Sequence, residues 1–292
     1  DDDSAGDDDD SAGDDDDSAG DDDDSALPAV WIEIDAELFF TCGLTSAGQA
    51  LCWGDNSDGQ TAAPPTVFEQ IAVGDKHACG RLPDDTVQCW GRSVDGQSTP
   101  PGGVLFSDIA AGDEFSCGLR TTDSLVECWG NGQFGALSEP AEAFISVEAG
   151  GDSVCGVRAN LSVNCWGGNG LALDDPAGAY SQVDVGWGGT AAGVRTDQSS
   201  SYWGFTDFQL GAAPAGLFQH FMASWQYACA VLADGTLDCW GSNNYGQQNH
   251  PATAGWATVE GGTNHACALS EAGAVTCWGD PTLDQLLVPV LP

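Results

Sequence analysis

The chain has 292 residues, with 45 acidic side chains against six basic ones and a formal net charge of −39. A charge of this sign repels phosphate groups, so the composition argues against nucleic-acid binding and against attachment to an anionic membrane. No apolar run approaches the roughly 18–20 residues of a membrane span, so membrane insertion is not expected. The twelve cysteines are typical of an oxidising compartment, which predicts an extracellular or cell-surface location.

Residues 1–26 form an acidic tail built from the unit Asp-Asp-Asp-Asp-Ser-Ala-Gly. No position of this seven-residue period is apolar, so a coiled coil is excluded. Dense like charge keeps such a chain extended, which predicts a stalk or linker between an anchor and the folded part. A second interpretation is a carboxylate ladder for Ca²⁺, which takes about 6–8 oxygen ligands. Its ligands would be Asp7, Asp8, Asp9, Asp10, Asp14, Asp15, Asp16 and Asp17.

Residues 27–292 consist of one unit that recurs seven times. Each unit opens on an aromatic residue and later carries a Trp-Gly pair, and successive Trp-Gly pairs lie 37 to 39 residues apart. The two marks keep the same register along the whole segment, so chance does not explain them. The opening residues are Trp31, Phe68, Phe106, Phe144, Tyr180, Phe218 and Trp256.

Each unit is composed of short segments that are typical of β-strands. FEQIAVG, HACGRL and TVQCWG in the second unit are rich in β-branched and aromatic residues and are bounded by Gly, Asp and Pro. LADGTLDCWG places Asp-Gly between two apolar runs, which indicates a hairpin. Seven units of three or four strands favour radial repetition, since a closed ring leaves only short sheet edges. The sequence therefore predicts an all-β, seven-bladed propeller, with an open β-solenoid as the alternative.

The cysteines fall into pairs within single units, ten or eleven positions apart. In the fifth unit both positions change together, to Ala192 and Tyr202, as expected if the partners belong to the same unit. A hairpin brings such positions face to face, close to the geometry of a disulfide. Zinc binding is disfavoured because no Cys-x-x-Cys occurs. One disulfide is predicted in six of the seven blades: Cys42–Cys52, Cys79–Cys89, Cys117–Cys128, Cys155–Cys165, Cys229–Cys239 and Cys267–Cys277.

Three stretches, GDKHACGRLPDDTVQCWG, LADGTLDCWGSNNYGQ and CWGDNSDGQ, resemble the regulator of chromosome condensation repeat. The resemblance covers residues 28–292 and implies a seven-bladed propeller. The family includes a nuclear nucleotide-exchange factor, a secreted β-lactamase inhibitory protein and many bacterial surface proteins. Because this chain is acidic and carries a cysteine pair in most units, it is more similar to a secreted, bacterial-type member than to the exchange factor.

No group of residues in the sequence supports catalysis, and no cofactor is required by any motif. Gly151-Asp152-Ser153 superficially resembles a protease nucleophile segment, but Gly-Asp also occupies this position at 74–75 and 112–113. His77 and His265 share one repeat position in which other units place aromatic residues, so they are expected to pack rather than to act as bases. We therefore predict that the protein is not an enzyme.

The candidate interaction residues are aromatic residues outside the repeat marks: Trp187 and Trp225 in loops after the first strand of their units, and Phe134 and Tyr245 in loops after Trp-Gly. Loops on one face of a propeller build binding surfaces, and aromatic residues dominate interface energies. The predicted function is a non-catalytic extracellular structural or interaction module, including the hypothesis of a self-assembling fibre or array subunit. The alternative is a binding or inhibitory module for a specific protein or glycan.

The two chain ends bear on self-assembly. LPAVW at the start and LLVPVLP at the finish fit the same position of the repeat, so we expect one end to pair in a blade and the other to lie over it. Pairing of an end with a neighbouring molecule would instead give strand addition and open filaments. Self-association through the tail or the chain ends is therefore part of the prediction.

Overall fold

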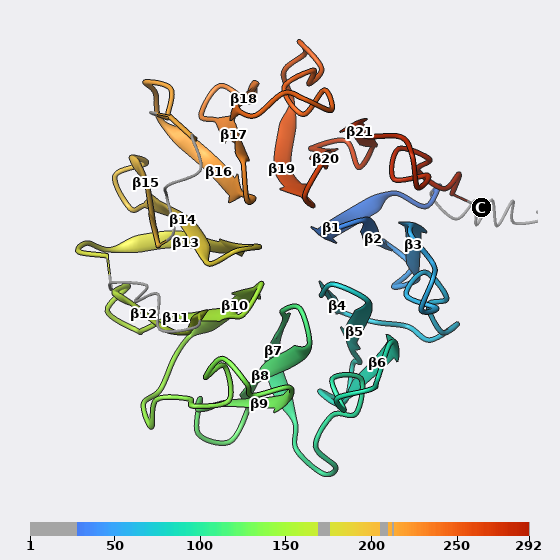
Figure 1. Ribbon diagram of the computed structural model, residues 1–292, viewed down its shortest axis with the longest axis vertical. Coiled ribbons are helices and arrows are strands. Elements are labelled where there is room, and N and C mark those ends of the chain that lie inside the picture. The colour runs from blue at the N-terminus through green and yellow to red at the C-terminus, as the bar shows by residue number, and fades with distance from the viewer. Residues whose placement is uncertain (1–27, 169–175, 205–209, 212, 292) are drawn as a thin grey trace, which may run out of the picture.

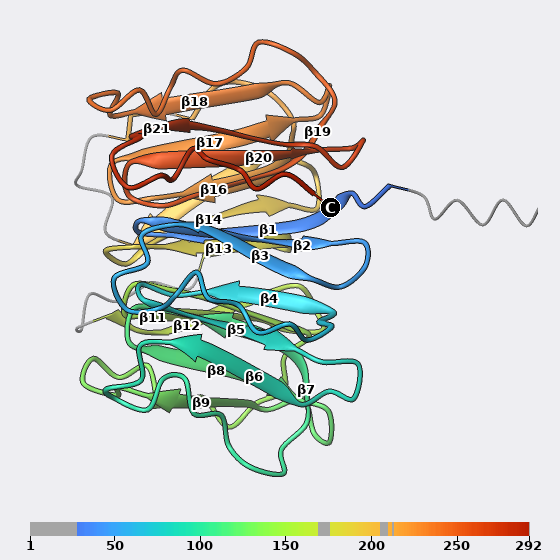
Figure 2. The ribbon, with the colours of Figure 1, turned by 90° about the vertical axis from the view of Figure 1, so that its right-hand side faces the viewer.

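The computed structural model describes residues 28–168, 176–204, 210–211 and 213–291. Within these residues, twenty-one short strands form seven three-stranded antiparallel sheets, arranged like the blades of a propeller (Figures 1 and 2). Each sheet contains three consecutive strands, so every blade corresponds to one sequence repeat. The predicted seven-bladed propeller is confirmed. No helix in the described part of the chain is long and apolar enough to cross a membrane.

The strands of each blade occupy three radial positions, with the first strand nearest the axis in Figure 1. The inner strands are β1 (Trp31–Glu37), β4 (Gln70–Val73), β7 (Phe106–Ala111), β10 (Ser146–Gly150), β13 (Tyr180–Gly186), β16 (Phe218–Ala223) and β19 (Trp256–Gly261). The middle strands are β2 (Phe40–Thr45), β5 (His77–Arg81), β8 (Phe115–Arg120), β11 (Ser153–Val157), β14 (Thr190–Arg195), β17 (Tyr227–Leu232) and β20 (His265–Ser270). The outer strands are β3 (Ala50–Gly54), β6 (Val87–Gly91), β9 (Val126–Gly130), β12 (Val163–Gly167), β15 (Ser200–Gly204), β18 (Leu237–Gly241) and β21 (Val275–Gly279).

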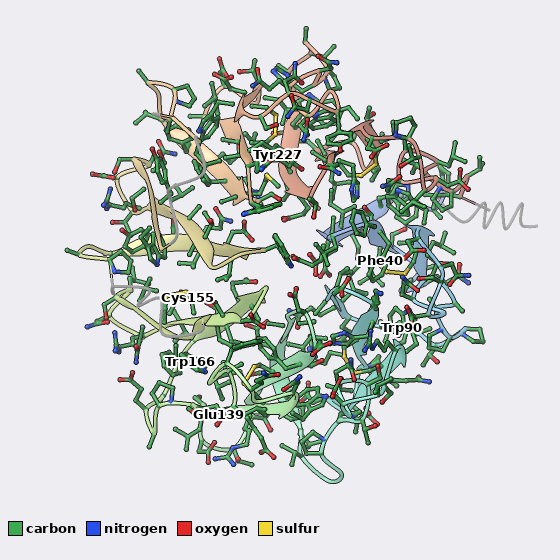
Figure 3. The ribbon with its side chains drawn as sticks, viewed as in Figure 1. Phe40, Trp90, Glu139, Cys155, Trp166 and Tyr227 are labelled. Carbon is green, nitrogen blue, oxygen red and sulfur yellow. A yellow bond between two sulfur atoms is a disulfide. The ribbon has the colours of Figure 1, made fainter. Side chains whose placement is uncertain are left out.

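The two aromatic marks of the repeat pack on each other inside a blade. In the second blade the ring centroids of Phe68 and Trp90 lie 5.6 Å apart, within the range of favourable aromatic pairs. The middle strand makes room for the opening ring with a glycine, because a Cβ added at Gly80 would lie 2.3 Å from Phe68 Cδ1. In the Cys-Gly dipeptide of the repeat, the cysteine forms the disulfide and the glycine leaves room for the aromatic ring. Figure 3 shows such side chains filling the space between the blades.

Identical hydrogen bonds join every pair of adjacent blades. The backbone N–H of an opening residue donates to a hairpin-turn carbonyl of the preceding blade, as from Phe106 to Asp85 (2.8 Å). The ring closes with the same bond, from Trp31 to Gly273 of the last blade (3.0 Å). The indole of Trp53 likewise donates to the carbonyl of Gln285 (2.9 Å).

These contacts correct one expectation about the chain ends. Neither 28–30 nor 280–291 forms a strand in a sheet, and each blade is built from one continuous segment. Near the C-terminus, Val288 and Leu291 instead pack against the core between the last and first blades, which includes Trp31. The hydrogen bonds from Trp31 and from the indole of Trp53 already join the first blade to the last. The ring therefore closes without a blade shared between the two chain ends.

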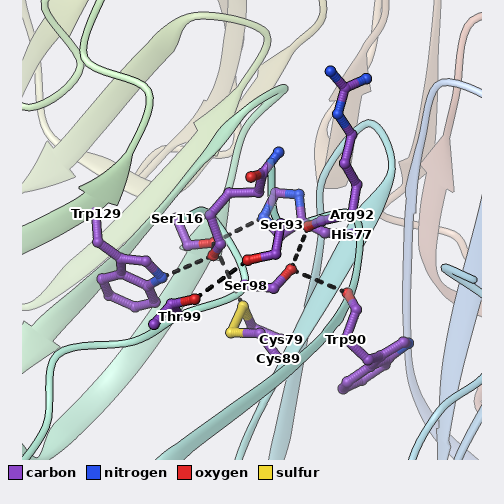
Figure 4. The surroundings of a disulfide bond; sticks show 11 residues. His77, Cys79, Cys89, Trp90, Arg92, Ser93, Ser98, Thr99, Ser116 and Trp129 are labelled. Atoms are coloured by element: carbon purple, nitrogen blue, oxygen red, sulfur yellow. Dashed lines mark hydrogen bonds between the residues drawn. A yellow bond between two sulfur atoms is a disulfide. The ribbon is translucent and has the colours of Figure 1, made fainter. Parts of the chain in front are cut away.

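All six predicted disulfides are present and join directly opposite residues of a middle and an outer strand, as for Cys79 and Cys89 in β5 and β6. In the fifth blade Ala192 lies opposite Tyr202 at the same register. Figure 4 shows the surroundings of Cys79–Cys89, where Ser116 of the next blade approaches the Cys79 sulfur at 3.4 Å. The pairing inferred from the fifth unit is confirmed.

The ends of the inner strands approach the next blade so closely that only glycine fits at some of them. A Cβ added at Gly186 would lie 1.8 Å from the carbonyl oxygen of Ala223. We expect Gly186→Ala to lower the free energy of unfolding by about 1–3 kcal/mol, the usual cost of overpacking, as measured by urea denaturation. Gly102→Ala is the control, since an added Cβ there meets nothing within 4 Å. Equal stability of the two variants would contradict the close approach.

Candidate binding surfaces in the channel and at its mouth

Polar side chains of the inner strands line a central cavity of about 280 Å³. They come from alternate positions of each strand, because successive side chains of a β-strand point to opposite faces. Positions two residues after the opening aromatic are polar in all seven blades: Glu33, Gln70, Asp108, Ser146, Gln182, His220 and Thr258. Positions four residues after it include four carboxylic acids: Asp35, Glu148, Asp184 and Glu260.

Several of these side chains hydrogen-bond to the inner strand of the next blade. Glu33 Oε1 accepts from the backbone N–H of Ile71 (3.1 Å). Gln182 both accepts from the N–H of Phe221 (3.0 Å) and donates to its carbonyl (2.9 Å). Each inner strand is the edge of its sheet. The N–H and C=O groups on its unpaired side would otherwise lack protein partners. Most polar side chains of the channel therefore connect blades.

The acidic residues four positions after the opening aromatic form a second ring around the channel. Only some of them hydrogen-bond to the next blade. Asp35 and Asp184 accept from the backbone N–H groups of Val73 (2.6 Å) and Ala223 (2.8 Å). Glu260 contacts His220, with 3.4 Å between Oε1 and Nε2. No hydrogen bond from a described residue reaches Glu148. Its carboxyl is therefore available to a further group in the channel.

Burial raises the pKa of several of these carboxyl groups. Removal from water raises the pKa of Glu33 to about 8, of Asp35 to about 6 and of Asp184 to about 7. It also raises the pKa of Glu260 well above the usual range, with the carboxylates of Asp184 and Asp35 adding to the shift. The channel thus concentrates carboxyl groups, and no Lys or Arg among the described residues lines its cavity.

Burial lowers the pKa of His220 to about 4. At neutral pH the imidazole is therefore uncharged, while the raised pKa of Glu260 favours its protonated form. The contact of His220 with Glu260, at 3.4 Å, is therefore not an ion pair at neutral pH.

A second cavity, of about 200 Å³, lies at the mouth of the channel among the loops that follow β7, β10 and β13. The indole N–H of Trp187 donates to Asp113 Oδ2 (3.0 Å), and the rings of Trp187 and Trp225 meet edge to face with centroids 4.7 Å apart. Asp113 Oδ1 and Ser153 Oγ are buried and have no hydrogen-bond partner among the described residues. The pocket therefore offers an aromatic wall beside polar atoms whose bonding capacity is unused.

Burial, followed by the nearby carboxylates of Asp75 and Asp152, raises the pKa of Asp113 to about 7. A cationic or hydrogen-bond-donating group that entered the pocket would relieve this repulsion and stabilise the ionised form.

The structure places the four candidate aromatic residues in loops on one face. Inner and outer strands run in the same direction, so the loops after both lie at the same end of each blade. Trp187 and Trp225 come together at the mouth pocket and are partly buried. Tyr245 is 51% exposed and Phe134 is partly buried, each in a loop after an outer strand.

His77 and His265 are fully buried. Each ring Nε2 lies 2.8 Å from a hydroxyl of the next blade, Ser116 and Thr41 respectively. These contacts are structural, as the repeat position suggested. Sequence reasoning missed the acidic channel, although the alternation in WIEIDAE (residues 31–37) carried the signal.

The aspartates assigned to Ca²⁺ binding, Asp7–Asp10 and Asp14–Asp17, lie outside the described residues. Across the described ranges, no group of three or more His, Cys, Asp or Glu side chains is arranged to hold a metal ion. The calcium hypothesis thus remains a prediction about the tail.

Three segments match the family model of the Regulator of chromosome condensation (RCC1) repeat, namely residues 38–60, 68–97 and 223–247. These segments lie in the first, second and sixth blades, where the predicted RCC1 repeats are confirmed. No curated protein matches the chain.

Solved structures share the fold. The CRINKLY WD40 ectodomain of the Arabidopsis thaliana receptor kinase ACR4 is similar over 87% of this chain and 98% of that chain, with a TM-score of 0.74 and 23% identity. The entire ectodomain of the Physcomitrella patens receptor kinase CR4 is similar over 86% and 74% of the two chains, with a TM-score of 0.72 and 21% identity. Human WBSCR16 is similar over 86% and 87%, with a TM-score of 0.66 and 16% identity. At these low identities, the structural likeness shows a shared propeller fold alone.

Proposed function

We propose that the protein is a non-catalytic extracellular interaction module that holds a protein partner on the face bearing the mouth pocket. The observation that carries this proposal is the pocket itself, where the Trp187–Trp225 pair borders the unused Asp113 Oδ1 and Ser153 Oγ. Tryptophan residues in well-packed pockets are typical centres of binding energy at interfaces.

The structural comparisons support the extracellular part of this proposal. Two of the similar folds are ectodomains of receptor kinases. Six disulfides within the described chain are typical of proteins that work outside the reducing cytosol. The high negative charge of the chain favours a partner with a basic surface over nucleic acid or an anionic membrane.

Trp187→Ala is expected to weaken partner binding at least tenfold, because truncation of an aromatic anchor commonly costs about 2 kcal/mol or more. The measurement is saturation binding of the fluorescently labelled full chain to the surface of the cells that produce it. Leu217→Ala is the matched control, since Leu217 is 52% exposed and precedes an inner strand on the opposite face. Equal loss in both variants, or in neither, would contradict binding at the mouth.

Self-assembly into fibres is the second candidate function. Its support is that both ends of the described chain lie on the face opposite the mouth (Figure 2), beside the exposed Val30. Sedimentation velocity of the same variants separates the two functions. A fibre subunit assembles regardless of Trp187→Ala, whereas a binding module loses its partner and stays monomeric.

A further inference from the structure

The central channel has features of a ligand site that are separate from the mouth pocket. Its cavity is lined from Ile32 to Glu37 of β1, a span of about 17 Å at ~3.3 Å per strand residue. Six carboxylic acids line this cavity, and no Lys or Arg among the described residues does so. They are Glu33, Asp35, Glu37, Glu148, Asp184 and Glu260.

Glu37 is the residue that points most directly to a ligand. It stands at the end of β1, at a repeat position where the other blades carry Gly74, Gly112, Gly150, Gly186, Ser224 and Gly262. The Glu37 side chain is 7% exposed and lines the cavity, and its Oε1 is buried without a hydrogen-bond partner among the described residues. A buried carboxylate left unpaired is costly, so its presence where glycine would fit calls for a partner that enters from solvent.

The other channel carboxylates indicate how the positive charges of that partner are spaced. Glu148, in β10, also receives no hydrogen bond from the described residues, whereas Glu33, Asp35 and Asp184 already bond the neighbouring strand. Glu37 and Glu148 lie on different blades and at different heights along the strands. A compact metal ion does not fit them, because the described acidic side chains form no metal-binding group.

The side chains between the carboxylates are apolar. Four residues after the opening aromatic, Ala72 and Ala110 stand between the acidic positions of the first and fourth blades, and Met222 stands between those of the fifth and seventh. The acidic positions of this ring therefore fall into two groups, Glu148 with Asp184 and Glu260 with Asp35, kept apart by apolar residues. This pattern complements a flexible chain of methylenes that carries spaced positive charges.

We propose that the channel binds a linear aliphatic polyamine, with its ammonium groups against Glu37 and Glu148 and its methylenes spanning the distance between these two blades. Ammonium groups donate up to three hydrogen bonds each, which matches carboxylates without partners. The bound cation neutralises carboxyl groups that otherwise repel one another inside the ring of blades.

The test is isothermal titration of the full chain with spermine at 0.3 M NaCl, where screening weakens binding to exposed charges such as those of the tail. We expect one spermine per chain, and an affinity at least tenfold lower in the double variant Glu37→Gln, Glu148→Gln. The matched control is Asp84→Asn, Asp234→Asn, which removes two charges from exposed hairpin turns and retains the acceptor oxygens. Putrescine, with two amines, is expected to bind more weakly than spermine in the wild type.

The tail is identical in all these proteins, so the comparison isolates the channel. Equal affinity in the two double variants, or binding of many spermines per chain that salt abolishes, would overturn the proposal and leave the tail as the polyamine-binding segment. Thermal unfolding of each variant confirms that the propeller is intact. The glutamine variant is expected to be at least as stable as the wild type, because it removes repulsion among the channel carboxylates.

Discussion

Refolding under reducing conditions is expected to lower the melting temperature of the propeller by more than about 20 °C. A disulfide that closes a loop of ten or eleven residues contributes roughly 2.5–3 kcal/mol by restricting the unfolded chain. One kcal/mol corresponds to about 2–4 °C in a domain of this size class, and six bridges act together even though their contributions do not simply add. The measurement is circular dichroism during thermal unfolding of chains refolded with and without reductant.

The experiment requires refolding because the middle-strand cysteine of each bridge is fully buried. The Cys42, Cys79 and Cys117 side chains have no exposed surface in the folded protein. The double variant Cys42→Ala, Cys52→Ala is the graded control and should lose only about 2–3 kcal/mol. A reduced chain that melts within a few degrees of the oxidised one would show that aromatic packing between the blades is sufficient for stability.

The free energy of unfolding is expected to fall by at least about 2 kcal/mol between pH 6.5 and pH 8, at ~1.4 kcal/mol per pH unit for each proton retained. Burial raises the pKa of Glu33 to about 8 and of Asp184 to about 7, so the folded state holds protons that the unfolded state has already released. Ionising these buried groups as the pH rises disfavours the folded state. Urea denaturation at three pH values across this window measures the slope.

The buried histidines act in the opposite direction, but at lower pH. Burial lowers the pKa of His77, His220 and His265 to about 4, so they favour the unfolded state as the pH falls below about 6.5. Exposed aspartates such as Asp84, whose pKa is lowered by the Thr86 hydroxyl and N–H, titrate below both ranges. Above pH 6.5 the buried carboxyls therefore determine the sign. A stability that rises between pH 6.5 and pH 8 would contradict their burial.

The architecture and the disulfides could be predicted from the repeat alone. The opening aromatic, the Trp-Gly pair and the cysteine positions recur with one period, and each takes its main contact within the same unit, as Phe68 with Trp90 and Cys79 with Cys89 do. The joint loss of both cysteines at Ala192 and Tyr202 identified the pairing without any structure. Contacts between positions so close in sequence repeat with the unit, and a periodic sequence therefore reveals them.

The binding surfaces were decided by the tertiary structure. The indole of Trp187 reaches Asp113 across 74 positions of the sequence, and Glu37 faces the same channel as Glu148 and Glu260 from three separate blades. Ring closure, likewise, rests on the hydrogen bond from Trp31 to Gly273 rather than on pairing of the chain ends. These residues converge because seven blades meet around one axis. The position of Glu37 on that axis, which no single repeat encodes, leaves its Oε1 without a hydrogen-bond partner among the described residues.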